Sequence, residues 1–191
     1  MDLSTVVLNS KYEIWQSKTL RQELKIKLYD ALVKSILLYN CGTWGLSKSE
    51  KKRIDSFHRR QLRIVINVRW PNKIKNKRLY EITRQEQISK TILERRWTLL
   101  GHVMRLSANC PARKAMRYYF EDRSTPKFAG RKRMTIVKTL NEDISLARKK
   151  CGTFKVIPLV SHVSLQNLHN KAKNRKLWRN IVKQIVDSAY S

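Results

Sequence analysis

The chain has 191 residues, 41% hydrophobic and 29% charged, a composition that excludes a wholly disordered protein and favours one domain or two small ones. It holds only five Gly and four Pro, and such a scarcity of turn formers argues against an all-β sandwich or barrel. Forty-two Lys and Arg oppose fourteen Asp and Glu, leaving a net charge of +28, which indicates a polyanionic partner.

Capping boxes mark the first two expected helices. Thr19-Leu20-Arg21-Gln22 predicts a helix that starts at Thr19 and ends near 40–42. The expected buried stripe of this helix is Leu24, Leu28, Ala31, Leu32, Ser35, Ile36 and Tyr39. Ser47-Lys48-Ser49-Glu50 predicts a second helix, antiparallel to the first. Its expected buried residues are Ile54, Phe57, Gln61, Ile64 and Val65.

The middle of the chain combines a very basic linker with a strong amphipathic helix. The segment 69–78, RWPNKIKNKR, predicts a loop that leads into a short helix at 79–84. Apolar residues spaced by three and four predict a helix from Ser89 to about Leu106, with Leu93, Trp97, Leu100 and Met104 buried. Gly101 within this helix indicates that another backbone packs closely against it.

The last third of the chain predicts further helices separated by loops. Helices are expected at 112–120, over the stripe from Ile136 to Ala147 that ends at Cys151-Gly152, and at 164–189. In the last helix the expected inward residues are Leu165, Leu168, Ala172, Trp178, Ile181, Val182, Ile185 and Ala189. The predicted fold is all-α, an irregular bundle of about six or seven amphipathic helices joined by basic loops.

Enzyme motifs are absent from the sequence. The only adjacent acids are Glu121-Asp122 and Glu142-Asp143, there is no Cys-x-x-Cys, and no Gly-rich phosphate loop occurs. We therefore expect no catalytic residue, no metal site and no cofactor. Bare Glu-x-Lys triplets at 23–25 and 50–52 leave one alternative, a divergent metal-dependent nuclease that uses Glu23, Glu50 or Glu142.

Basic residues are the candidate binding site, because Lys and Arg neutralise phosphates and release counterions. The candidates are Arg69, Lys73, Lys75, Lys77, Arg78, Arg131, Lys132, Arg133, Lys171, Lys173, Arg175, Lys176 and Arg179. The expected partner is the backbone of RNA, DNA or a hybrid, with the choice among them open. Trp70 lies among these residues, but a single aromatic is more often part of the core, which is where we expect it.

Cysteine spacing and hydropathy bear on the compartment. Three scattered cysteines do not form a secreted disulfide framework, and no stretch approaches the ~18 apolar residues of a membrane span. We expect a soluble intracellular protein, nuclear or cytoplasmic, that is not secreted and does not bind membranes.

Five segments resemble a known family. They are KLYDALVKSILLYNCGTW at 27–44, DSFHRRQLRIVI at 55–66, RRWTLLGHVMR at 95–105, GRKR at 130–133 and NRKLWR at 174–179. In order and spacing they resemble the region that follows the polymerase palm in reverse transcriptases of non-LTR retrotransposons.

The resemblance implies a division into three parts: a thumb-like helical domain over 11–121, a basic loop over 122–133 and a C-terminal helical extension over 134–191, the two helical parts forming separate domains or one. Such a region would grip RNA or DNA without catalysis, next to an upstream palm domain that carries the catalytic Asp residues. Asn40, Gly42, Lys132 and Ile136 depart from the family pattern. A second alternative is therefore a decayed fragment that retains no activity.

Overall fold

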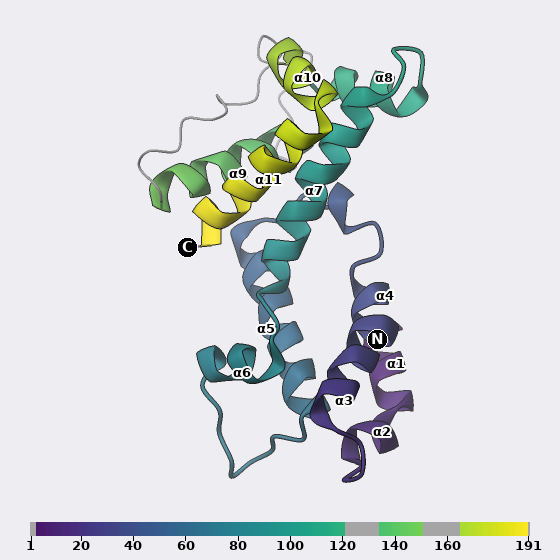
Figure 1. Ribbon diagram of the computed structural model, residues 1–191, viewed down its shortest axis with the longest axis vertical. Helices are drawn as coiled ribbons and strands as arrows, with labels where there is room; N and C mark the ends of the chain where they lie inside the picture. The colour runs from purple at the N-terminus through teal and green to yellow at the C-terminus, as the bar shows by residue number, and fades with distance from the viewer. Residues whose placement is uncertain (1–2, 121–133, 151–164, 191) are drawn as a thin grey trace, which may run out of the picture. The chain divides into compact units, whose positions relative to one another are not determined.

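The computed structural model describes residues 3–120, 134–150 and 165–190 (Figure 1). All regular structure in these ranges is helical and no strand occurs among them, so the all-α prediction is confirmed. The chain forms two compact units. Unit 1 comprises Met1–Asn40 and Ser49–Thr91, and unit 2 comprises Cys41–Lys48 and Ile92–Ser191. The basic loop expected at 122–133 lies outside the described residues.

Unit 1 is built from short helices around one core. Its elements are α1 (Leu3–Ser10), α2 (Tyr12–Gln16), α3 (Gln22–Tyr29), a π-helical turn η1 (Asp30–Lys34), α4 (Ser35–Leu37), α5 (Lys48–Val65) and α6 (Asn76–Thr83). Their buried side chains form one cluster: Leu8, Trp15, Ile26, Tyr29, Val33, Leu62, Val65 and Leu79. Burial of these side chains is the main favourable term that holds the unit together.

The start of α3 differs from the prediction. The helix begins at Gln22 with Arg21 as its N-cap residue and no side-chain cap, so the capping box at Thr19 is wrong. The reason is local, because the Thr19 hydroxyl lies 2.9 Å from the Ser17 hydroxyl in the preceding turn.

The buried face of α3, η1 and α4 also differs from the prediction. Ile26, Tyr29 and Val33 are buried, whereas Leu24 is 44% exposed and Tyr39 is 81% exposed. The segment carries two apolar stripes, and only one of them includes Tyr29. The Tyr29 hydroxyl finds hydrogen-bond partners on α5, so this stripe is the one that packs inward.

Helix α5 begins where its capping box predicted, but its buried face is more polar than expected. Gln61 and Val65 are buried as predicted, together with Asp55, His58 and Leu62. The Asp55 carboxylate accepts hydrogen bonds from the Ser89 amide (2.9 Å) and the Ser89 hydroxyl (2.8 Å). Ser89 lies in the first turn of the next long helix, where a carboxylate is favoured by the helix dipole.

Unit 2 contains the longer helices. They are the main part of α7 (Ile88–Arg105), α8 (Pro111–Phe120), α9 (Ile136–Lys150), α10 (Leu165–Lys173) and α11 (Arg175–Tyr190), with a short 3₁₀ turn η2 (Cys41–Thr43). Helix α11 packs along α9 (Figure 1). The core of this unit includes the predicted stripe of α7 and every inward residue predicted from Leu168 to Ala189.

Two features of unit 2 correct the sequence analysis. The expected single helix at 164–189 is broken at Asn174, whose side-chain oxygen accepts a hydrogen bond from the Leu177 amide (3.0 Å) and so caps α11. Gly101 is closely packed as predicted, but its neighbour is a side chain and not a backbone. A Cβ atom at position 101 would lie 2.1 Å from Nε1 of Trp178.

A buried ion pair joins three parts of unit 2. Arg96 Nη1 lies 2.5 Å from Asp143 Oδ2, and both side chains are almost completely buried. Arg96 Nη2 donates to the Trp44 carbonyl at 2.9 Å. Removing one partner of such a pair leaves an uncompensated buried charge, so this contact fixes α9 and the 41–48 link against α7.

Candidate nucleic-acid interface

The predicted basic residues of unit 1 lie on its surface. We call Arg69, Lys73, Lys75, Lys77 and Arg78 the basic segment, and all five are exposed. Lys77 and Arg78 lie in the first turn of α6 and not in the expected loop, because that helix already begins at Asn76.

Trp70 lies on the surface of the basic segment and is 83% exposed, so the expectation that it belongs to the core is wrong. The physical reason is that Ile74, and not Trp70, packs this connection against the core. An exposed indole ring flanked by cations is a surface on which an unpaired base can stack.

Two members of the basic segment have partners within unit 1. The Arg69 guanidinium lies over the Tyr12 ring, 5.4 Å from its centroid, and donates a hydrogen bond to the Tyr12 hydroxyl. Arg78 forms an exposed ion pair with Glu81 at 3.3 Å. Exposed pairs of this kind contribute only ~0–1 kcal/mol, so Arg78 can exchange Glu81 for a phosphate at little cost.

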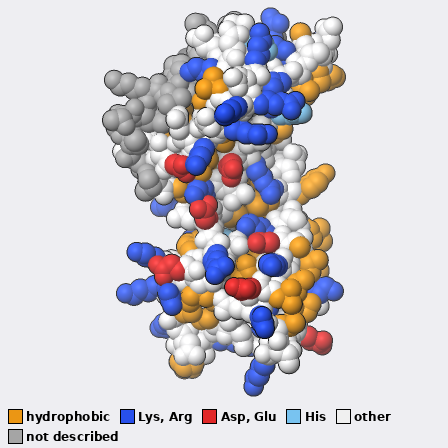
Figure 2. Space-filling model, viewed as in Figure 1, with side chains coloured by type: hydrophobic (Ala, Val, Ile, Leu, Met, Phe, Trp, Pro, Cys, Tyr) orange, Lys and Arg blue, Asp and Glu red, His pale blue; other side chains and the backbone are white. Residues whose placement is uncertain are grey.

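The second group of predicted residues lies on α10 and the start of α11. Lys173, Arg175, Lys176 and Arg179 are exposed, and Lys171 is half-buried. Residues 95–118 and 165–186 contain no Asp or Glu. In Figure 2 basic side chains crowd over the region of α8 and α10.

Arg105 joins this group although the sequence analysis did not select it. Its Nη1 donates to the carbonyl of Ala172 at 3.0 Å, in the last turn of α10. Burial, together with the charges of Arg175 and Arg179, lowers the pKa of Arg105. The charges of Arg175 and Arg179 therefore both act unfavourably on the Arg105 guanidinium. We call these residues the α10–α11 basic surface: Arg105, Lys171, Lys173, Arg175, Lys176 and Arg179.

Several cations lie at helix N-termini, where a positive charge destabilises an isolated helix. Helix N-termini favour negative charge, and each misplaced cation costs ~0.3–1 kcal/mol. Among the described helices, three have a pair of adjacent cations and no acid in the first turn. The pairs are Lys77 and Arg78 in α6, Arg113 and Lys114 in α8, and Arg175 and Lys176 in α11. A bound anion would offset this cost at each end.

The remaining predicted site residues, Arg131, Lys132 and Arg133, lie outside the described residues. The basic segment belongs to unit 1 and the α10–α11 basic surface to unit 2. Sequence reasoning missed Arg105, because it is a single cation at the end of an apolar helix and no charge run marks it.

A buried polar network in unit 1 was also missed. The Tyr29 hydroxyl donates to Gln61 Oε1 (2.9 Å) and lies 2.8 Å from His58 Nδ1. Burial, with smaller contributions from the charges of Lys34 and Arg59, lowers the pKa of His58 to about 3. Burial also raises the pKa of Tyr29. Both groups are therefore neutral at pH 7.

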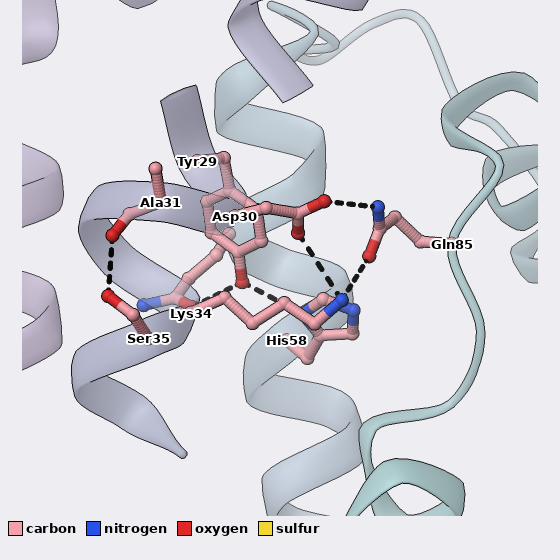
Figure 3. Close-up of polar contacts among 8 residues, drawn as sticks. Tyr29, Asp30, Ala31, Lys34, Ser35, His58 and Gln85 are labelled. Carbon is pink, nitrogen blue, oxygen red and sulfur yellow. Dashed lines mark hydrogen bonds and ion pairs between the residues drawn. The ribbon is translucent and has the colours of Figure 1, made fainter. Parts of the chain in front are cut away.

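A second polar cluster, a triplet of Asp30, Lys34 and Gln85, lies beside the π-helical turn (Figure 3). Lys34 Nζ lies 2.6 Å from Gln85 Oε1 and 3.3 Å from Asp30 Oδ1. Gln85 Nε2 completes the triplet by donating to Asp30 Oδ2 at 3.0 Å. These bonds hold the 84–87 connection against η1, which is a structural role.

The acids named for a nuclease are divided between the units, with Glu23 and Glu50 in unit 1 and Glu142 in unit 2. In the described ranges, no three His, Cys, Asp or Glu side chains lie close enough to hold a metal ion. Within the same ranges no helix combines the length and apolar character that crossing a membrane requires. Comparisons of the chain with protein-family models, curated proteins and solved structures give no match.

Proposed function

We propose that this chain is a non-catalytic nucleic-acid-binding fragment that grips RNA or DNA backbone through Lys and Arg. It resembles the thumb and C-terminal region of a non-LTR retrotransposon reverse transcriptase. In a larger polyprotein of that kind, its partner would be an upstream polymerase palm domain.

The observation that carries the proposal is the α10–α11 basic surface. Arg175 and Arg179 both repel Arg105, whose guanidinium is held against α10 by the carbonyl of Ala172 at 3.0 Å. Residues 95–118 and 165–186 contain no acid. A folded chain keeps such an arrangement at a cost in stability, and a polyanion offsets that cost when it binds. Backbone phosphates supply negative charge at regular spacing and without sequence information.

Trp70 adds a second contact of a different kind. Its ring is exposed, and the exposed Lys73, Lys75 and Lys77 follow it in the chain. Stacking of one base on an aromatic ring contributes ~1–3 kcal/mol. Because duplex bases are already stacked on each other, this contact favours single-stranded regions.

The proposal is tested by binding measurements over a salt series with single-stranded RNA, duplex DNA and an RNA–DNA hybrid. The logarithm of the affinity should fall linearly with the logarithm of the salt concentration, at a slope of about −4 to −6, as roughly five to seven phosphate contacts give. Absence of binding near physiological salt would overturn the proposal and favour a decayed fragment.

A pair of charge-matched variants locates the contact. Arg175→Gln with Arg179→Gln should make the slope shallower by roughly 1.5–2. Lys138→Gln with Lys149→Gln removes the same charge from exposed positions on α9 and should change the slope little. Equal effects of the two variants would mean that net charge acts without a defined surface.

A further inference from the structure

A pocket in unit 2 lies beside the α10–α11 basic surface. Its volume is about 560 Å³, within the ~300–1,000 Å³ range typical of small-ligand sites. Val103 and Met104 of α7 and Met116 of α8 supply its apolar floor, and the first two are buried. Methionine side chains adapt well to flat ring systems, so the floor suits a heterocyclic base.

The rim of the pocket is cationic and comes from α8. Arg113, Lys114 and Arg117 line it. Arg113 Nη1 donates to the Leu106 carbonyl at 2.5 Å, which holds this guanidinium in place, while Lys114 and Arg117 are exposed. No acidic side chain lines the pocket, so its rim attracts anions.

The third wall comes from α10 and the connection before α8. His169 Nδ1 donates to the Met104 carbonyl at 2.9 Å, since a carbonyl oxygen only accepts. Gln166 and Asn109 add amide groups, which can donate to or accept from the polar edge of a base. The lining therefore offers an apolar floor, amide groups and a cationic rim to one ligand.

Building on the function proposed above, we propose that this pocket receives the phosphorylated terminal nucleotide of a nucleic-acid strand. The phosphate would lie on the α8 cations and the base on the methionine floor. A terminal phosphomonoester carries about −1.5 to −2 charge at pH 7 and three strong acceptor oxygens, more charge than an internal diester. Lys171 and Lys173 follow His169 on the same helix, so the strand can continue onto the α10–α11 basic surface.

The test compares a 12-nucleotide single-stranded RNA in three forms: with a 5′-phosphate, with a 3′-phosphate, and with neither. One phosphorylated form should bind about tenfold more tightly than the unphosphorylated strand, as one added hydrogen bond to a charged group gives. Adenosine monophosphate is the fourth probe. It should compete only weakly, because it lacks the contacts beyond the pocket.

Two variants separate the pocket from general charge. Lys114→Gln with Arg117→Gln should abolish the tenfold advantage, whereas Lys173→Gln with Lys176→Gln, outside the pocket, should weaken all strands and keep the ratio. Met116→Trp fills the floor without changing charge, so it should remove the advantage, while the unphosphorylated strand keeps its contacts with the α10–α11 basic surface. Circular dichroism and thermal midpoints establish that each variant is folded.

The outcomes distinguish this inference from the proposed function. Equal affinity of all three strands, with strong binding, would overturn the pocket assignment and leave the nucleic-acid function standing. Binding of no strand would overturn both. Adenosine monophosphate that binds as tightly as a phosphorylated strand would overturn the strand-end assignment in favour of a free nucleotide.

Discussion

Replacing Gly101 with alanine should destabilise unit 2, although alanine is the better helix former. A Cβ atom at position 101 would lie 2.1, 2.5 and 2.6 Å from three atoms of the Trp178 indole. The ring is rigid and buried, and its Nε1 donates to the Trp97 carbonyl at 3.0 Å. The ring must therefore move, and the hydrogen bond is lost or distorted.

The magnitude follows from three effects. Overpacking of a buried site costs ~1–3 kcal/mol, and leaving a buried donor and acceptor unpaired costs ~1–3 kcal/mol. Exchanging Gly for Ala within a helix stabilises the helix by ~1 kcal/mol. We expect Gly101→Ala to lower the free energy of unfolding by about 3 kcal/mol, measured by urea denaturation followed by far-ultraviolet circular dichroism.

The matched control is the same substitution in a Trp178→Leu background. Without the indole ring the added methyl group has room, so Gly101→Ala should there be neutral or stabilising. An unchanged or higher urea midpoint for the single variant would refute the reasoning, since it would mean that α11 does not pack on Gly101.

Three further predictions concern the surface and the buried histidine. Replacing Lys73, Lys75, Lys77 and Arg78 together with alanine should weaken binding to all sequences alike and flatten the salt slope; loss confined to one sequence in anisotropy titrations would contradict backbone recognition. Trp70→Ala should cost ~1–3 kcal/mol of affinity for single strands and little for duplexes, and an equal loss for both would exclude base stacking. His58 is neutral in the fold with a pKa of about 3, below its ordinary 6.5; the unfolded chain therefore binds the extra proton first, and stability falls as pH drops below 6.5. By pH 4.5 the free energy of unfolding should have fallen by about 2–3 kcal/mol relative to pH 7, as measured by urea denaturation at both pH values. A His58→Gln variant that loses as much stability over the same range would disprove that His58 is the cause.

Apolar periodicity predicted unit 2 well because its helices have one apolar stripe each. On α11, Trp178, Ile181, Ile185 and Ala189 recur at spacings of three and four, with cations on the opposite face, and all four are buried. On α3 the same method selected a face that is only partly buried. Leu28 and Leu32 pack against the edge of the core, but Leu24 is exposed, and the equally regular stripe of Ile26 and Tyr29 is the buried one. Tyr29 has hydrogen-bond partners on α5 that lie more than 25 residues away in the chain, and these decide which stripe is buried. No local sequence pattern contains that information.

Buried polar residues were missed for a related reason. Asp55, His58, Arg96 and Asp143 look like surface residues on charged helices, and each is buried with a distant partner. Arg96 and Asp143 are 47 residues apart. At the candidate interface, the exposed cations of the basic segment could be expected from composition alone. Arg105 could not, because its role depends on Arg175 and Arg179, which α11 brings near it.

The exposure of Trp70 gives the chain an optical reporter of its own. Of the five tryptophans, Trp15, Trp97 and Trp178 are at most 2% exposed and Trp44 is half-buried, whereas Trp70 is 83% exposed. Its intrinsic emission should therefore be red-shifted and readily quenched by acrylamide, while the emission of the three buried indoles persists. A base that stacks on Trp70 would quench the emission of this accessible tryptophan selectively. Binding of a nucleic-acid strand to the basic segment can therefore be followed in the unlabelled protein.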